Sequence, residues 1–145
     1  MTKVGIVGFG EFSRLMVREL SPYFEILVST RTMPENPESF ACKFVSNKEL
    51  LAQEIIIPSM PSQFLRGYFT ANKDLVNKEA LIIDVCSVKV EPVATLLDVL
   101  PESCEILATH PMFGPFSAAN GIAGLQIMVH PTRIEDNKYS QIKNL

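Results

Sequence analysis

The sequence predicts an α/β protein built on a doubly wound, mainly parallel sheet with helices on both faces. Short and nearly continuous apolar runs recur along the chain, which is typical of strands that are buried on both faces. Segments of helical periodicity separate these runs, so strand and helix alternate as they do in right-handed βαβ crossovers. The apolar runs that predict strands are residues 4–7, 26–28, 55–57, 81–83, 106–108 and 127–129.

The helical segments are marked by their ends as well as by their periodicity. Pro22 ends the first one, since proline cannot continue a helix. Ser46 is suited to the N-cap of the second, with Glu49 in the position that completes a capping box. Pro61 opens the third, and Pro92 lies in the first turn of the fourth. Helices are therefore expected at residues 12–20, 48–53, 61–71, 92–100 and 134–145, and a loop at 32–39.

Length and composition bound the class of protein. The 145 residues are the size of one domain, and 47% apolar with 20% charged residues excludes a disordered chain. A net charge of −3 without a basic stripe argues against a nucleic-acid surface. The three cysteines and two histidines show no disulfide or metal pattern, which predicts a reduced, metal-free, cytoplasmic chain. No secretory signal is found, and no apolar run approaches the roughly 20 residues that span a bilayer, so no membrane partner is expected.

A glycine turn follows the first predicted strand and leads directly into the first helix. Gly8 and Gly10 occupy the first two glycine positions of a GxGxxG-type turn, and Ser13 stands at the third. In a Rossmann turn the first glycine permits the tight bend, the second admits the pyrophosphate to the helix N-terminus, and the third lets helix and strand pack closely. Serine is small enough for that packing, so a dinucleotide is expected to bind at Gly8, Gly10, Glu11, Phe12 and Ser13. The alternative is a glycine-rich turn that binds no ligand.

The end of the second predicted strand bears on the choice between NADP and NAD. Chains that bind NAD carry an acidic residue about 20 positions after the turn, where it bonds the ribose 2′-hydroxyl. Ser29, Thr30 and Arg31 occupy that region here. No carboxylate repels a 2′-phosphate, the hydroxyls can donate to it, and Arg31 can pair with the phosphate and stack on adenine. NADP is therefore the expected cofactor; the alternative is NAD, with Arg31 a solvated loop charge.

Polar side chains follow two further strands at the edge where open α/β sheets bind their ligands. One strand leads into residues 84–89, which contain Asp84, Ser87 and Lys89. Another leads into residues 109–115, which contain His110 and Gly114. Since neighbouring parallel strands end at the same edge, His110 and Ser87 are expected to face one crevice beside the nicotinamide. The alternative is that these side chains are structural or solvated.

These motifs resemble the N-terminal nucleotide-binding domain of the prephenate/arogenate dehydrogenase family, whose members act in tyrosine biosynthesis. The matching features are the opening residues 4–10, the DxxSxK element at 84–89, and the HPMFGP element at 110–115, which is followed by Ser117 and Gly121. They stand in the family's order and spacing over nearly all of the chain. The 3-hydroxyacid dehydrogenases, imine reductases and pyrroline-carboxylate reductases share the glycine turn but lack the HPMFGP element. The hydroxyl-rich stretch at Arg31 resembles the NADP-using, arogenate-type members.

The resemblance implies an NADP-dependent oxidative decarboxylation of arogenate or prephenate. Hydride passes from the ring carbon that bears the 4-hydroxyl to the nicotinamide, while the ring carboxylate leaves as carbon dioxide and the ring aromatises. By family correspondence His110 accepts the 4-hydroxyl proton, a role that suits a neutral imidazole. Ser87 hydrogen-bonds the same hydroxyl or His110. Pro58, Ser59 and Met60 are expected to pack against the nicotinamide ribose.

The remaining expectations concern the substrate side and the extent of the chain. Gly114 and Lys89 are assigned to the substrate side, with a structural or cofactor-side contact as the alternative for Lys89, and Asp84 is expected to organise its loop. Residues 1–145 are interpreted as one dinucleotide-binding domain, without the family's C-terminal helical dimerisation domain. Three interpretations stay open: a piece of a full dehydrogenase, a short chain completed by a partner or as a homodimer, or a stand-alone NADP-binding module. An accidental match of another NADP reductase is a further alternative.

Overall fold

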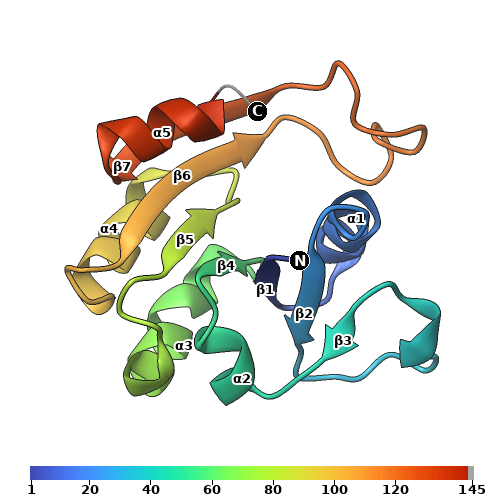
Figure 1. The fold of residues 1–145 in the computed structure, drawn as a ribbon, viewed down its shortest axis with the longest axis horizontal. Coiled ribbons are helices and arrows are strands. Elements are labelled where there is room, and N and C mark those ends of the chain that lie inside the picture. Colours follow the sequence, from blue (N-terminus) through green and yellow to red (C-terminus); the bar gives the residue numbers. More distant parts are fainter. Residues whose placement is uncertain (144–145) are drawn as a thin grey trace.

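The chain folds around one seven-stranded sheet (Figure 1), and the computed structural model describes residues 1–143. The strand order is β3-β2-β1-β4-β5-β6-β7, so the chain starts in the middle, builds to one edge, and then returns beside β1 to build to the other. Strands β1 to β6 pair in parallel, and β7 pairs antiparallel with β6. The strands are β1 (Lys3–Val7), β2 (Glu25–Ser29), β3 (Lys43–Phe44), β4 (Ile55–Pro58), β5 (Leu81–Asp84), β6 (Glu105–Pro111) and β7 (Ile127–Arg133).

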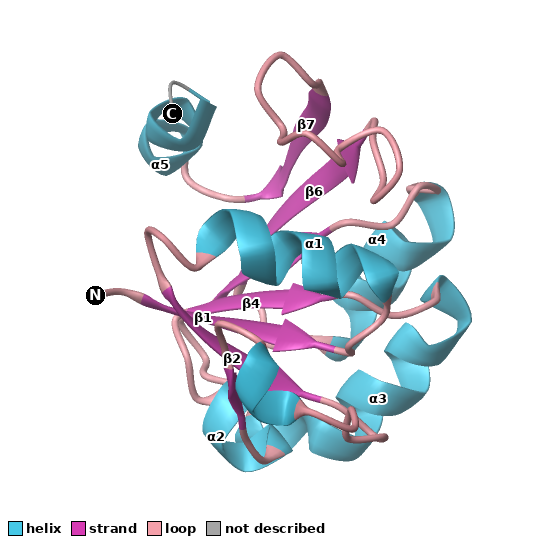
Figure 2. Ribbon diagram, turned by 90° about the vertical axis from the view of Figure 1, so that its right-hand side faces the viewer, coloured by secondary structure: helices cyan, strands magenta, loops and turns pink. Residues whose placement is uncertain are grey.

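Helices cover both faces of the sheet (Figure 2). On one face Leu50, Phe69 and Leu96, from α2, α3 and α4, pack on Ile56 and Ile82 of the sheet. On the other face α1 packs on β1 and β2. The helices are α1 (Glu11–Leu20), α2 (Asn47–Leu51), α3 (Leu65–Asn72), α4 (Val90–Val99) and α5 (Asp136–Lys143), with short 3₁₀ turns at Pro37–Ser39, Ser62–Phe64 and Lys73–Leu75.

Local chemistry sets where α1 and α2 begin. Gly10 is the N-cap residue of α1 and makes no side-chain cap bond, while Glu11 places a negative charge in the first turn. At α2 the Ser46 hydroxyl accepts a hydrogen bond from the backbone N–H of Glu49 at 3.2 Å. The expected N-cap of this helix is therefore confirmed. The two helices therefore differ at their N-termini. In α2 a side chain of the protein accepts from one of the first backbone N–H groups, whereas in α1 no side chain caps these groups and they can bind an anion.

The predicted fold class is confirmed, and the differences lie at the edges of the sheet. Every apolar run forms a strand, but β3 was not predicted because a two-residue strand carries no periodicity. Strand β7 runs antiparallel to its neighbour, a direction that an apolar run does not encode. The helix expected from residue 61 begins as a 3₁₀ turn and becomes α-helical at Leu65. The last helix spans Asp136–Lys143, and residues 144–145 of the expected segment lie outside the described residues.

Within residues 1–143, none of the helices has both the length and the apolar character that crossing a membrane requires.

The packing beneath α3 gives a stability prediction. Phe69 is fully buried in the larger core cluster, whereas Tyr23 is 71% exposed. We expect Phe69→Ala to lower the free energy of unfolding by about 3–5 kcal/mol, because it removes a buried ring and leaves a cavity. Urea unfolding followed by circular dichroism measures this, with Tyr23→Ala as the matched control at less than about 0.5 kcal/mol. Equal losses in the two variants would contradict the assigned core.

Candidate active site

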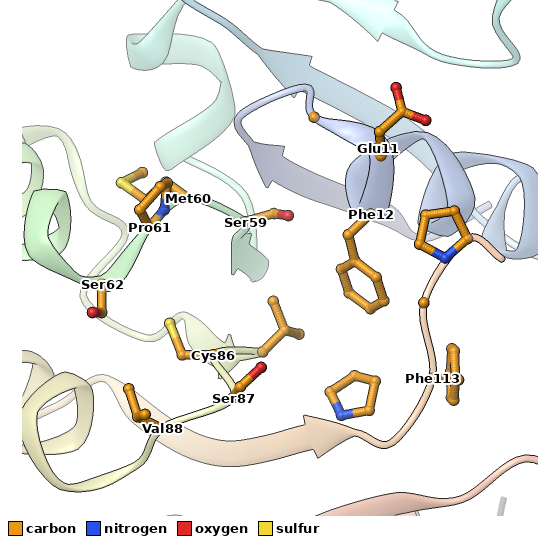
Figure 3. A pocket seen from close by; sticks show the side chains of 15 residues that line it. Glu11, Phe12, Ser59, Met60, Pro61, Ser62, Cys86, Ser87, Val88 and Phe113 are labelled. Carbon is orange, nitrogen blue, oxygen red and sulfur yellow. The ribbon is translucent and has the colours of Figure 1, made fainter. Parts of the chain in front are cut away.

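A cleft of about 550 Å³ opens at the carboxyl ends of the central strands (Figure 3). It is bounded by the loops that follow β1, β4, β5 and β6, which lie far apart in the chain. The lining residues are 10–12, 59–62, 85–88, 111 and 113–115. This is the edge at which doubly wound sheets bind their ligands.

The glycine turn forms one wall of the cleft and depends on a close backbone contact. Gly8 has a φ of +98°, and a Cβ on it would lie 2.4 Å from the carbonyl oxygen of Ser59. The N–H of Gly8 donates to the carbonyl of Ser29, and the N–H of Ser59 donates to the carbonyl of Val7, each at 2.8 Å. Both the positive φ and the lack of space require glycine at this position.

Ser13 and Ser59 are joined across the back of this wall. Ser13 lies in the first turn of α1 and is fully buried. Its hydroxyl is 2.9 Å from the Oγ of Ser59, to which it donates. The third position of the glycine turn therefore carries a hydrogen bond that glycine could not make.

The expected 2′-phosphate loop follows β2, on the other side of β1 from the cleft. Ser29 is 8% exposed, and its hydroxyl donates to the side-chain oxygen of Asn47. The phenol of Tyr68 donates to the same Asn47 oxygen at 3.1 Å. Thr30 is half-buried, with its hydroxyl donating to the carbonyl of Thr32 at 3.1 Å, and Arg31 is exposed. Thr30 and Arg31 are thus the accessible residues of the predicted set.

A buried ion pair joins the ends of β5 and β6. Asp84 is fully buried, and one of its carboxylate oxygens accepts a hydrogen bond from the ammonium of Lys89, whose side chain is 21% exposed. The other accepts the N–H of Cys86 at 2.9 Å. The Lys89 ammonium also donates to the carbonyl of Thr109 at 2.5 Å, and the Thr109 hydroxyl donates to the carbonyl of Asp84 at 2.7 Å. Lys89 therefore holds the strand ends together rather than lining the cleft.

The two residues with predicted catalytic roles differ in position. Ser87 lies in the lining, three residues beyond the end of β5. His110 is half-buried near the end of β6, where it pairs with Met128 of β7. It lies beside the cleft, since its neighbour Pro111 is the residue of β6 that reaches the lining. Gly114 is in the lining, and its assignment to the substrate side stays a prediction.

Aromatic rings form a wall that the sequence did not predict as a unit. Phe12 projects from α1 into the cleft, and Phe113 lies on the segment after β6 (Figure 3). Their ring centroids are 6.3 Å apart at an interplanar angle of 46°. Phe113 stands inside the HPMFGP element, but no local signal links it to a residue of the glycine turn.

Comparison with known proteins places the chain in a family. Residues 39–129 match the family described as "Prephenate dehydrogenase, nucleotide-binding domain". The chain belongs to that family. The match contains the Ser87 and His110 segments, whereas the glycine turn, which also borders the cleft, precedes the matched residues.

The sequence relatives are plant enzymes that are much longer than this chain. It is 28% identical over 151 residues to Arabidopsis thaliana arogenate dehydrogenase 2, chloroplastic, and the match covers 92% of this chain and 39% of that protein. It is also 28% identical over 149 residues to arogenate dehydrogenase 1, chloroplastic, of the same plant, covering 91% of this chain and 22% of that protein. The chain therefore spans about two fifths or less of these relatives.

Solved structures share the fold at low sequence identity. Prephenate dehydrogenase from A. aeolicus, in complex with hydroxyphenyl propionate and NAD⁺, has a TM-score of 0.79 at 17% identity, over 99% of this chain and 56% of that one. Synechocystis arogenate dehydrogenase has a TM-score of 0.76 at 18% identity, over 99% and 55%. An imine reductase from Pseudomonas sp. has 0.77 at 14%, over 99% and 51%. At these identities the likeness concerns the fold alone.

The thiol in the cleft gives a prediction about reactivity. Burial, and after it the charge of the nearby Asp84 carboxylate, raises the pKa of Cys86 to about 12. Because the thiolate is the nucleophile, we expect Cys86 to react slowly with iodoacetamide at pH 8, and about tenfold faster for each unit of pH up to that value. Peptide mass spectrometry over pH 7–10 measures the rate, with the chain unfolded in urea as control. Equal rates in folded and unfolded chains at pH 8 would contradict the assignment.

Proposed function

We propose that this chain binds NADP and forms the nucleotide-binding part of a dehydrogenase that oxidatively decarboxylates arogenate or prephenate, a step toward tyrosine. The observation that carries the proposal is that the glycine turn, the Ser87 loop and the segment after His110 border one cleft. Membership of the family supports it, as do two relatives named arogenate dehydrogenase. The cytoplasmic location and the homodimer expected from the sequence remain predictions.

The residues at the turn fit a dinucleotide. Gly8 leaves the space that a Cβ would fill, and the first N–H groups of α1 have no side-chain cap. An anionic diphosphate suits such a helix end, because the free donors and the helix dipole both favour negative charge. Gly10, Glu11 and Phe12 would hold the diphosphate through their backbone, while Pro58, Ser59 and Met60 border the nicotinamide half.

The preference for NADP over NAD rests on the loop after β2. Arg31 is exposed and Thr30 is half-buried, so both are accessible to a phosphate. The sequence predicts that the Ser29 hydroxyl donates to the 2′-phosphate. In the structure that hydroxyl donates to Asn47 instead. Arg31 is thus the residue we expect to distinguish the 2′-phosphate from a 2′-hydroxyl.

The chemistry assigned to this chain is proton transfer and positioning. NADP, when bound, supplies the hydride acceptor. His110 takes the proton of the substrate's 4-hydroxyl, which assists departure of the hydride. Ser87 hydrogen-bonds that hydroxyl or the imidazole. The ion pair of Asp84 with Lys89 holds the backbone near Ser87 and His110. The rings of Phe12 and Phe113 exclude water from the side of the cleft that they line.

A stand-alone NADP-binding module is the second candidate function. It is favoured by the position of His110 beside the lining rather than in it. The enzyme requires a further element over the cleft, such as a helical domain or a partner chain, because substrate positioning and exclusion of water are worth orders of magnitude in rate. The module requires only the glycine turn and the Arg31 loop.

The cofactor preference is tested at Arg31. We expect Arg31→Ala to weaken NADPH binding by about tenfold or more, the value of a charge-assisted contact to phosphate, and to weaken NADH binding much less. Titration of reduced-nicotinamide fluorescence measures both affinities. The charge-matched control is Lys78→Ala, an exposed cation that precedes β5 and so lies at the amino-terminal ends of the strands, away from the loop after β2. Equal losses for NADPH and NADH at Arg31→Ala would show that this residue does not read the 2′-phosphate.

The catalytic role is tested at His110. We expect His110→Ala to lower NADPH formation from arogenate or prephenate by roughly 10²-fold or more, with NADPH affinity unchanged. The assay follows absorbance with each substrate, using this chain and any longer product of the same gene. His130→Ala is the matched control, because His130 is exposed on β7. Full turnover in His110→Ala would refute the role, and NADPH binding without turnover in every form of the protein would favour the module.

A further inference from the structure

A serine stands where the glycine turn ordinarily has its third glycine, and it is hydrogen-bonded to the residue that follows β4, the strand next to β1. Ser13 lies in α1 and Ser59 follows β4, and their hydroxyl oxygens are 2.9 Å apart. Ser13 is fully buried, so its hydroxyl has no access to a ligand. Ser59 is half-buried and lines the cleft. In Figure 3 its side chain points from the end of β4 toward helix α1.

The backbone of Ser59 is held independently of this bond. Its N–H donates to the carbonyl of Val7 at 2.8 Å. Its own carbonyl lies against Gly8, where a Cβ would approach to 2.4 Å. Because the backbone of Ser59 is fixed on β1, only rotation of its side chain can change the direction of its hydroxyl. The hydrogen bond from Ser13 restricts that rotation.

Among the described residues 1–143, the Ser59 hydroxyl accepts a hydrogen bond from Ser13 and donates none within the protein. A serine hydroxyl has one donor and two acceptor positions. Since Ser59 accepts from Ser13, its donor remains available, and the accessible side of the residue is the cleft. A hydroxyl held in this way costs less conformational entropy to bind a ligand than one that rotates freely. A glycine at position 13 would remove this constraint.

We propose that Ser13 is a positioning residue that orients Ser59 to donate a hydrogen bond to an oxygen acceptor in the nicotinamide half of the dinucleotide, either the ribose or its adjoining phosphate. The half is assigned by topology. The strand order places the cleft on the β4 side of β1, whereas Arg31 follows β2 on the other side. This inference rests on the proposed binding of NADP.

Binding to two ligands tests the proposal. The ligands are NADPH and 2′,5′-ADP, which contains the adenosine and 2′-phosphate but no nicotinamide half. We expect Ser59→Ala to weaken NADPH binding by about fivefold to tenfold and Ser13→Ala by about threefold, in the range of a single hydrogen bond. The double variant should equal Ser59→Ala, because Ser13 acts only through Ser59. All three should bind 2′,5′-ADP as the original chain does.

Two controls separate positioning from a loss of fold. Ser13→Gly gives the turn its usual residue and should match Ser13→Ala in affinity, and thermal unfolding of each variant confirms that it is folded. Ser103→Ala removes an exposed hydroxyl just before the amino end of β6, opposite the carboxyl ends where the cleft lies, and should change neither affinity.

Several outcomes would overturn the proposal. If the effects of Ser13→Ala and Ser59→Ala multiply in the double variant, Ser13 does not act through Ser59. If 2′,5′-ADP binding falls as much as NADPH binding, Ser59 does not contact the nicotinamide half. If Ser59→Ala binds NADPH normally, its hydroxyl is no donor to the cofactor. Failure of the original chain to bind either ligand would instead refute the proposed function, and this inference with it.

Discussion

The contact between the ends of β1 and β4 is the constraint on which the rest of the site depends. Gly8 lies so close to the carbonyl of Ser59 that no side chain fits between them, and Ser59 in turn bonds the last residue of β1. This contact sets the angle at which the chain leaves β1, and hence where α1 begins. The open N-terminus of α1 and the serine pair both lie beside that close approach.

A second constraint of different physical character holds the other half of the cleft. Asp84 and Lys89 form an ion pair in which the carboxylate is fully buried, and a buried charge is tolerated only when it is paired and hydrogen-bonded. Here the carboxylate also accepts a backbone N–H, while the ammonium reaches the carbonyl just before His110. The cofactor half is therefore held by backbone packing, and the proposed catalytic half by a network of charge.

Some parts of the fold could be predicted from residues close together in the sequence, and others could not. The apolar runs, the Ser46 cap and the glycine turn all depend on neighbours in the chain, so their residue types alone predict them. The two-residue β3 and the antiparallel direction of β7 depend on which strand lies alongside. Ser29 is the clearest case in the site: its residue type favours phosphate binding, but Asn47, from the following helix, takes its hydroxyl.

The sequence by itself determined the α/β class, the position of the glycine turn and the motifs that mark the family, because each is encoded by residues close together in the chain. Only the tertiary structure decided that Lys89 bonds residues at the ends of β5 and β6, that His110 lies beside the cleft lining, and that the Ser13 hydroxyl donates to Ser59. These are contacts between side chains and backbone from different strands, and their existence depends on sheet order and on distances of a few ångströms. Spacing along a sequence contains no record of such distances.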